Sequence, residues 1–111
     1  MPFEVVLLAP AVVFIDSLEL RFRAKALRTI GLLQRFGPQL PLPHARKLSG
    51  YDLWELRVQM ANLICRLFYF RDRRGVFVIT SGFIKKTTRT SRTEIDRAVN
   101  LKDEYNRGES L

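Results

Sequence analysis

Arg66 is the only charged residue in the most apolar segment of the chain, Leu63 to Phe70. An arginine in such a segment costs free energy unless its guanidinium reaches water, a carboxylate or a ligand phosphate. Two explanations stay open at this point: a structural ion pair with Glu55 on a neighbouring strand, and a binding site for phosphate. The planar guanidinium can bind two phosphate oxygens at once, which suits the second explanation.

Three other cations are candidates for the same site. Arg57 lies on the strand predicted before that of Arg66, and Lys85 and Lys86 follow the last predicted strand. If these strands form an antiparallel meander, we expect all four cations to converge on one side of the sheet. The further candidates for RNA contacts are Arg73, Arg74, Phe83, Thr87 and Arg89. Tyr69 and Phe83 could stack on a base, although aromatic residues beside a sheet core more often pack.

Other kinds of catalytic site find no support in the sequence. No Cys/His set has zinc spacing, no acidic cluster could hold catalytic magnesium, and neither a Gly-rich phosphate loop nor a nucleophile elbow is present. We therefore expect no metal and no cofactor, and we interpret Cys65 and His44 as structural. RNA carries its own nucleophile, because its 2′-hydroxyl can attack the adjacent phosphate when cations stabilise the developing charge.

The composition indicates a globular protein with a basic surface. The 111 residues are 47% hydrophobic and 27% charged, which predicts one domain over residues 1–111. The formal net charge of +8 favours nucleic acid, an acidic protein or an anionic membrane as partner, and the cations between residues 57 and 97 predict one basic face. The apolar start of the chain lacks a basic region, and no apolar run approaches the roughly 20 residues of a membrane span, so we expect a cytoplasmic location.

The helices and strands expected to position the candidate site residues predict an α+β fold. Strands are expected over Phe3–Leu8, Leu53–Val58, Leu63–Phe70 and Val76–Thr80, and helices over Ala11–Ser17, from a cap at Asp16 to Phe36, and from a Ser91–Glu94 capping box to about Asn106. The stretch 38–43, with three prolines, is predicted as a loop. The result is a mostly antiparallel sheet of about four strands, mixed through the first strand, with two N-terminal helices and one C-terminal helix.

The middle strand has the clearest pattern. Trp54, Leu56 and Val58 alternate with Glu55 and Arg57. Successive side chains of a strand point to opposite faces. The apolar three are therefore expected on one face of the sheet and the two charged residues on the other.

Several short blocks of this sequence occur in a familiar order. They are Phe14–Leu18, Leu53–Arg57, Arg66–Tyr69, and Gly82–Thr87 ahead of Glu94–Ile95. Together they resemble RelE/HigB-type toxins of type II toxin-antitoxin systems, specifically the phage-derived RelE-like branch. The resemblance covers nearly the whole chain and implies the small RelE-like fold.

The resemblance also implies an activity and partners. It implies a ribosome-dependent, metal-independent endoribonuclease that cuts mRNA, inhibits translation and is neutralised by a cognate antitoxin, typically a helix-turn-helix DNA-binding protein. Arg66 matches the strand arginine that contacts the scissile phosphate, and Arg57 matches the arginine that ends the Trp-Glu-Leu-Arg block. Lys85 and Lys86 match the basic group after the last strand. One departure is Ser81, which stands where many relatives have a histidine.

Two alternatives use the same fold. A ParE-type toxin would inhibit DNA gyrase by binding and would cleave no RNA. A decayed prophage protein would keep only antitoxin binding and operator regulation, which the missing histidine allows. The sequence favours the RNase, because the interior Arg66 and the paired Lys85 and Lys86 have an obvious phosphate role that a pure binder does not need.

Overall fold

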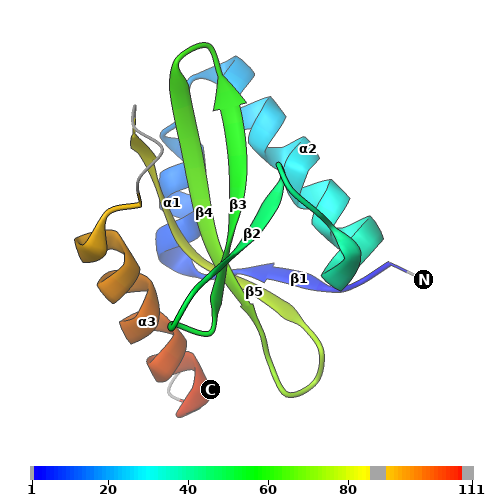
Figure 1. Ribbon diagram of the computed structural model, residues 1–111, viewed down its shortest axis with the longest axis vertical. Helices are drawn as coiled ribbons and strands as arrows, with labels where there is room; N and C mark the ends of the chain where they lie inside the picture. The colour runs from blue at the N-terminus through cyan, green and yellow to red at the C-terminus, as the bar shows by residue number, and fades with distance from the viewer. Residues whose placement is uncertain (1, 86–89, 109–111) are drawn as a thin grey trace.

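The protein is a five-stranded sheet covered by helices on both faces (Figure 1). A computed structural model describes residues 2–85 and 90–108. The strands are β1 (Val5–Leu7), β2 (Ala45–Leu48), β3 (Leu53–Met60), β4 (Leu63–Arg71) and β5 (Phe77–Lys85), the helices are α1 (Ala9–Asp16), α2 (Leu20–Phe36) and α3 (Arg92–Asn106), and a 3-10 turn, η1 (Gly37–Gln39), follows α2. The strand order is β1-β5-β4-β3-β2, with β1 parallel to β5 and the other pairs antiparallel. The predicted α+β class with a mixed sheet is confirmed.

Two hydrophobic cores lie on the two faces of this sheet. Helices α1 and α2 pack on the face that carries Leu56, Val58 and Leu67, whereas α3 packs on the face that carries Phe68 and Phe70. The predicted alternation along β3 is confirmed, because Trp54, Leu56 and Val58 belong to the first core. The side chains of Glu55 and Arg57 consequently point to the α3 face.

The sheet has one strand more than expected, β2. Its pattern is a buried Ala45, two exposed cations and a buried Leu48, so it shows no alternation of apolar and polar residues. It lies at the edge of the sheet and pairs only with the first half of β3, from Leu53 to Leu56. A four-residue edge strand with so little apolar content leaves almost no periodic signal.

The second N-terminal helix ends at Phe36 as predicted, but the first helix and the start of the second lie at other residues than predicted. Helix α1 starts at Ala9 and ends at Asp16, so Asp16 does not cap α2. Glu19 is the cap instead, and its carboxylate accepts hydrogen bonds from the backbone N–H groups of Arg21 and Phe22 at 3.0 and 3.2 Å. An acidic cap satisfies N–H groups of the first turn and interacts favourably with the helix dipole.

The last strand is longer than predicted. Strand β5 continues through Gly82 to Lys85, so Lys85 ends the strand instead of following it. Its register with β4 shifts between Phe68 and Tyr69, because Phe68 pairs with Ser81 while Tyr69 pairs with Ile79. The extra residue is a β-bulge, and it changes which face the later side chains of β5 point to.

Ser91 caps α3 at the predicted position, but its side chain makes no capping hydrogen bond. Within the described residues, no helix combines the length and apolar character needed to cross a membrane. Those residues also hold no group of three or more His, Cys, Asp or Glu side chains able to share a metal ion.

Candidate functional site: an arginine cluster around a buried glutamate

Three of the four predicted catalytic cations lie on the α3 face of the sheet. Arg57 pairs with Arg66 across β3 and β4, and Lys85 pairs with Ile64, two residues before Arg66 on β4. Alternate residues of a strand share a face, so the side chains of Arg57, Arg66 and Lys85 point to the same side. The predicted convergence is confirmed for these three. Lys86, Thr87 and Arg89 lie outside the described residues.

The centre of the cluster is a carboxylate. Glu55 is fully buried, and its Oε1 accepts a hydrogen bond from Arg66 Nη1 at 2.8 Å. The same oxygen lies 3.8 Å from Arg57 Nε and 3.5 Å from Arg46 Nε. Three guanidinium groups therefore surround one carboxylate, and the cluster keeps more positive than negative charge.

Thr90, in the segment just before α3, is hydrogen-bonded to both members of the buried ion pair. The Thr90 hydroxyl donates to Glu55 Oε2 at 3.0 Å and accepts a hydrogen bond from Arg66 Nη1 at 3.2 Å. Both oxygens of Glu55 thus have protein partners. A buried carboxylate satisfied in this way holds its neighbours in fixed positions.

The three arginines differ in their access to solvent. The Arg66 side chain is 0% exposed, whereas the side chains of Arg57 and Arg46 are 24% and 42% exposed. Burial lowers the pKa of the Arg66 guanidinium and the Glu55 carboxylate raises it, but arginine stays charged throughout the physiological pH range. The ion pair between Arg66 and Glu55, one of the two explanations for a charge in this strand, is present.

Arg57, like the more exposed Arg46, is a member of the cluster whose side chain reaches solvent. Its Nε is buried and has no hydrogen-bond acceptor within the described part of the chain. Its distance of 3.8 Å from Glu55 Oε1 exceeds hydrogen-bond length. The charge of Glu55 therefore holds the Arg57 guanidinium in place, while part of the Arg57 side chain reaches solvent.

The sequence analysis missed Arg46. It lies on β2, opposite Glu55 on β3, and this pairing brings its guanidinium to the carboxylate. The one local signal was the Ser49-Gly50 turn between Leu48 and the next strand, which is typical of a hairpin. Recognising that turn would have placed Arg46 on a strand next to Glu55.

Comparison with known proteins agrees with this arrangement of elements. The sequence model of the family described as Phage derived protein Gp49-like matches residues 13–103. The chain belongs to this family. No curated protein matches the chain.

Solved structures similar to this Gp49-like protein are RelE proteins and their complexes. A mutant of the Escherichia coli toxin RelE in the free state has a TM-score of 0.66 at 16% identity, over 90% of this chain and 97% of that one. A chain of the Mycobacterium tuberculosis toxin-antitoxin complex RelBE2 has a TM-score of 0.57 at 20% identity, over 77% of this chain and all of that one. A chain of the archaeal RelE–RelB complex from Pyrococcus horikoshii has a TM-score of 0.57 at 22% identity, over 81% and 100%. These likenesses confirm the RelE-like fold that the sequence predicted.

Two predicted RNA contacts of the Gp49-like protein lie away from the cluster. Arg73 and Arg74 belong to the turn between β4 and β5, and β4 reaches this turn five residues after Arg66, roughly 16 Å along the strand. Arg74 instead contacts Asp72 and the Tyr105 hydroxyl. The RNA contacts expected of Arg73 and Arg74 stay a prediction, separate from the cluster.

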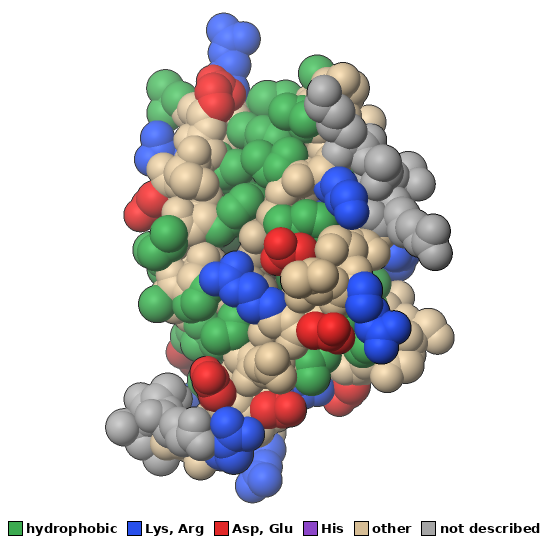
Figure 2. All heavy atoms as spheres, turned by 90° about the vertical axis from the view of Figure 1, so that its left-hand side faces the viewer, with side chains coloured by type: hydrophobic (Ala, Val, Ile, Leu, Met, Phe, Trp, Pro, Cys, Tyr) green, Lys and Arg blue, Asp and Glu red, His purple; other side chains and the backbone are tan. Residues whose placement is uncertain are grey.

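The molecular surface also shows no single basic face in the view of Figure 2. Lys and Arg side chains are interspersed there with Asp and Glu, and hydrophobic side chains form a band between them. On this face the cations do not form one continuous patch. The cluster around Glu55 is distinctive because its charges are packed together and partly buried.

The two residues predicted to stack on an RNA base, Tyr69 and Phe83, lie on opposite faces of the sheet. Phe83 lies opposite Arg66 and stacks on Phe68, with ring centroids 5.7 Å apart. Tyr69 is buried in the core on the α2 face, where it stacks on Trp54. Tyr69 is therefore a packing residue, and only Phe83, which is half-buried, lies on the same face as the arginines.

Proposed function

We propose that this Gp49-like protein is the toxin of a type II toxin-antitoxin pair and that it cuts mRNA on the ribosome without a metal ion. The observation that carries the proposal is the arginine cluster around Glu55, in which the partly exposed Arg57 and Arg46 lie beside a surplus of positive charge. Such preorganised donors stabilise a phosphate whose charge grows during reaction. The RelE-like fold supports the same function.

In the proposed reaction, RNA supplies the nucleophile. The 2′-hydroxyl oxygen attacks the adjacent phosphorus and loses its proton, and the 5′-oxygen of the next nucleotide leaves and gains one. The products are a 2′,3′-cyclic phosphate and a 5′-hydroxyl. The protein holds the reacting groups in line and stabilises the pentacoordinate phosphorus.

The residues of the cluster have different parts in this reaction. Arg57, whose side chain is partly exposed, contacts the scissile phosphate, and the more exposed Arg46 is a second candidate for this contact. Arg66 is sealed in the sheet and acts through Glu55, whose carboxylate fixes the position of Arg57. The direct phosphate contact that the family resemblance implies for Arg66 would require its guanidinium to become exposed. Lys85 and Lys86 supply further positive charge, and one of them exchanges protons with the reacting oxygens.

The proposed partner is a cognate antitoxin. Two of the similar structures are described as toxin-antitoxin or RelE–RelB complexes. An acidic partner would complement the positive charge of this chain and block access to Arg57. By resemblance, the antitoxin is a helix-turn-helix protein.

The test is primer extension on a defined mRNA programmed into ribosomes, with magnesium chelated in a ribosome-free control. We expect codon-spaced cuts by the wild-type protein and cleavage slowed about 100-fold in Arg57→Ala, the order expected for loss of one preorganised donor. Arg35→Ala is the matched control, because Arg35 is an exposed cation in the last turn of α2 and should cut normally. Absence of cuts, combined with growth arrest in cells, would contradict the RNase and turn attention to DNA gyrase.

A further inference from the structure

A pocket of about 240 Å³ lies beside the arginine cluster, at the part of β3 that β2 leaves uncovered. The last backbone contact on that edge is the hydrogen bond from the Arg57 N–H to the His44 carbonyl, at 2.8 Å. Beyond it, β2 does not pair with Val58 to Met60. The pocket is lined by Lys25, Thr29, Pro43, His44, Arg57, Val58, Gln59 and Ile64.

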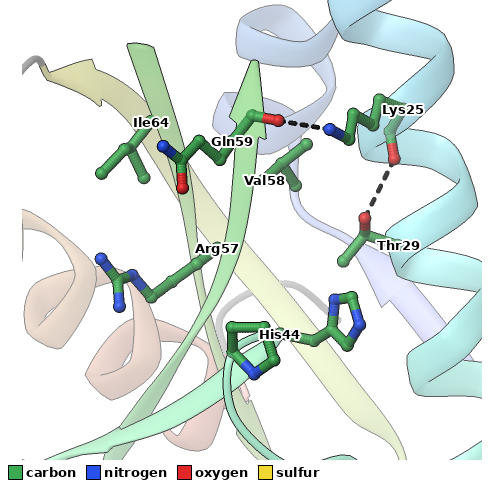
Figure 3. A pocket seen from close by; sticks show the side chains of 8 residues that line it. Lys25, Thr29, His44, Arg57, Val58, Gln59 and Ile64 are labelled. Carbon is green, nitrogen blue, oxygen red and sulfur yellow. Dashed lines mark hydrogen bonds between the residues drawn. The ribbon is translucent and has the colours of Figure 1, made fainter. Parts of the chain in front are cut away.

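The lining residues bring hydrogen-bond donors together. Lys25 Nζ donates to the Gln59 carbonyl, which holds the ammonium over the strand edge (Figure 3). The Thr29 hydroxyl donates to the backbone carbonyl of Lys25 at 3.0 Å, within α2. The Gln59 N–H points to the same edge as its carbonyl. The imidazole of His44 lies on the side of the pocket below Thr29 in this view. None of the described residues that line the pocket carries a carboxylate.

Arg57 belongs both to this pocket and to the cluster around Glu55. In Figure 3 the Arg57 guanidinium points away from Lys25 and Thr29, so a ligand that contacts both the cluster and the pocket must pass around the edge of β3. The volume of the pocket is several times that of one water molecule, so a polar group of a ligand fits inside it. The pocket is thus a continuation of the candidate site toward α2.

We propose that this pocket binds the mRNA nucleotide next to the scissile phosphodiester, with Lys25 contacting its phosphate and His44, Pro43 and Val58 contacting its sugar or base. The proposal rests on the function proposed above and adds a subsite to it. His44, interpreted from the sequence as structural, becomes a ligand contact. Lysine binds phosphate as a compact point charge, which suits an ammonium that must also keep its bond to the Gln59 carbonyl.

An acidic peptide of a partner protein is the competing occupant, and the strand edge disfavours it. A peptide that adds to a sheet edge needs the backbone donor and acceptor of the same residue. At Gln59 the acceptor is already bound by Lys25 Nζ. A nucleotide needs only donors, and the pocket offers those.

Binding can be measured without catalysis, because His44 is the only histidine of the chain and its ring protons give a single set of NMR signals. A trinucleotide of 2′-O-methylated RNA, which cannot be cleaved, would be titrated into the wild-type protein. We expect a saturable shift of the His44 Hε1 signal and at least tenfold weaker binding by Lys25→Ala. Arg35→Ala is the control of equal charge loss and should bind like wild type. A His44 signal that stays in place, or equal affinity of Lys25→Ala and wild type, would overturn the proposal.

A second measurement separates this subsite from the proposed function. On programmed ribosomes, Lys25→Ala and His44→Ala should cut roughly tenfold more slowly than wild type, with a changed preference for the nucleotide beside the cut. Saturable binding at His44 by a wild-type protein that makes no cuts would support the subsite and refute the RNase. Unchanged rate and preference in both variants would refute the subsite. So would variants that cut normally but escape neutralisation by the antitoxin, since the pocket would then belong to that partner.

Discussion

Glu55 and Arg66 form an ion pair in which neither side chain is exposed and Oε1 lies 2.8 Å from Nη1. Glu55 is on β3 and Arg66 on β4, so the pair joins the two strands at the α3 face. Placing two charges in the interior costs several kcal/mol per ion, which their attraction and hydrogen bonds must offset. A pair retained at that cost points to a role in fixing the neighbouring Arg57.

Removing one partner of this pair should be far more damaging than removing both. We expect Glu55→Ala to lower the free energy of unfolding by about 3–5 kcal/mol, because it removes the carboxylate that balances a buried guanidinium. The double variant Glu55→Met with Arg66→Met should retain most of the wild-type stability and should have lost RNA cleavage. Urea denaturation and primer extension test the two expectations. A Glu55→Ala protein as stable as wild type would show that the pair does not hold the strands.

The glycine of the Gly82–Thr87 block should be required for packing. A Cβ on Gly82 would lie 2.6 Å from Leu67 Cδ2 and 2.7 Å from Phe14 Cδ2, and Phe14 belongs to α1. Gly82→Ala should therefore destabilise the protein by about 1–3 kcal/mol as α1 is pushed from β5. Gly31→Ala is the control, because the added carbon meets no described atom within 4 Å beyond its chain neighbours and the backbone of its own helix, and a helical alanine should stabilise α2 by about 0.5–1 kcal/mol. Thermal unfolding of both variants measures the difference.

Stability should decline at alkaline pH because two acidic groups are buried. Burial raises the pKa of the Cys65 thiol from 9.0 to about 12 and that of the Tyr69 phenol from 10.0 to about 12. Above pH 9 the unfolded chain loses protons that the folded chain keeps, so each group lowers the stability by about 1.4 kcal/mol per pH unit once its unfolded form ionises. Urea denaturation between pH 8 and 11 should show this decline, and the variant Cys65→Ala with Tyr69→Phe should lack most of it. Equal slopes for the two proteins would count against the prediction.

The attachment of the C-terminal end of α3 to the sheet should depend on a hydrogen bond from the Tyr105 hydroxyl. This hydroxyl donates to Asp72 Oδ2 at 2.8 Å and joins α3 to the turn between β4 and β5. Burial opposes the ionisation of Asp72, but this bond and the N–H groups of Val76 and Arg74 outweigh it and lower the pKa of Asp72. The stabilisation is therefore present above pH 3.8 and is lost as the pH falls through the lower pKa of the folded state.

Tyr105→Phe should accordingly lower the unfolding free energy by about 1 kcal/mol at pH 7, the usual contribution of one hydrogen bond. The difference from wild type should shrink below pH 4. Denaturation curves at pH 7, 4 and 3 measure it. A constant difference across this range would mean that the hydroxyl acts by packing and not through the charge of Asp72.

The sequence alone determined the class of fold and the composition of its cores. The alternation of Trp54, Leu56 and Val58 with charged residues, and the apolar run around Cys65, depend on spacings of one or two residues, so each segment carries its own pattern. The order of those segments then indicated the RelE-like family, and the family match agrees.

Only the tertiary structure decided which charges meet. The bulge at β5 places Lys85 on the same face as Arg66, and without it every later side chain of the strand would point to the other face. Pairing of β2 with β3 brings Arg46 to Glu55, and the length of β4 carries Arg73 away from the cluster. Register, bulges and strand length arise from contacts between distant segments, which no local pattern contains.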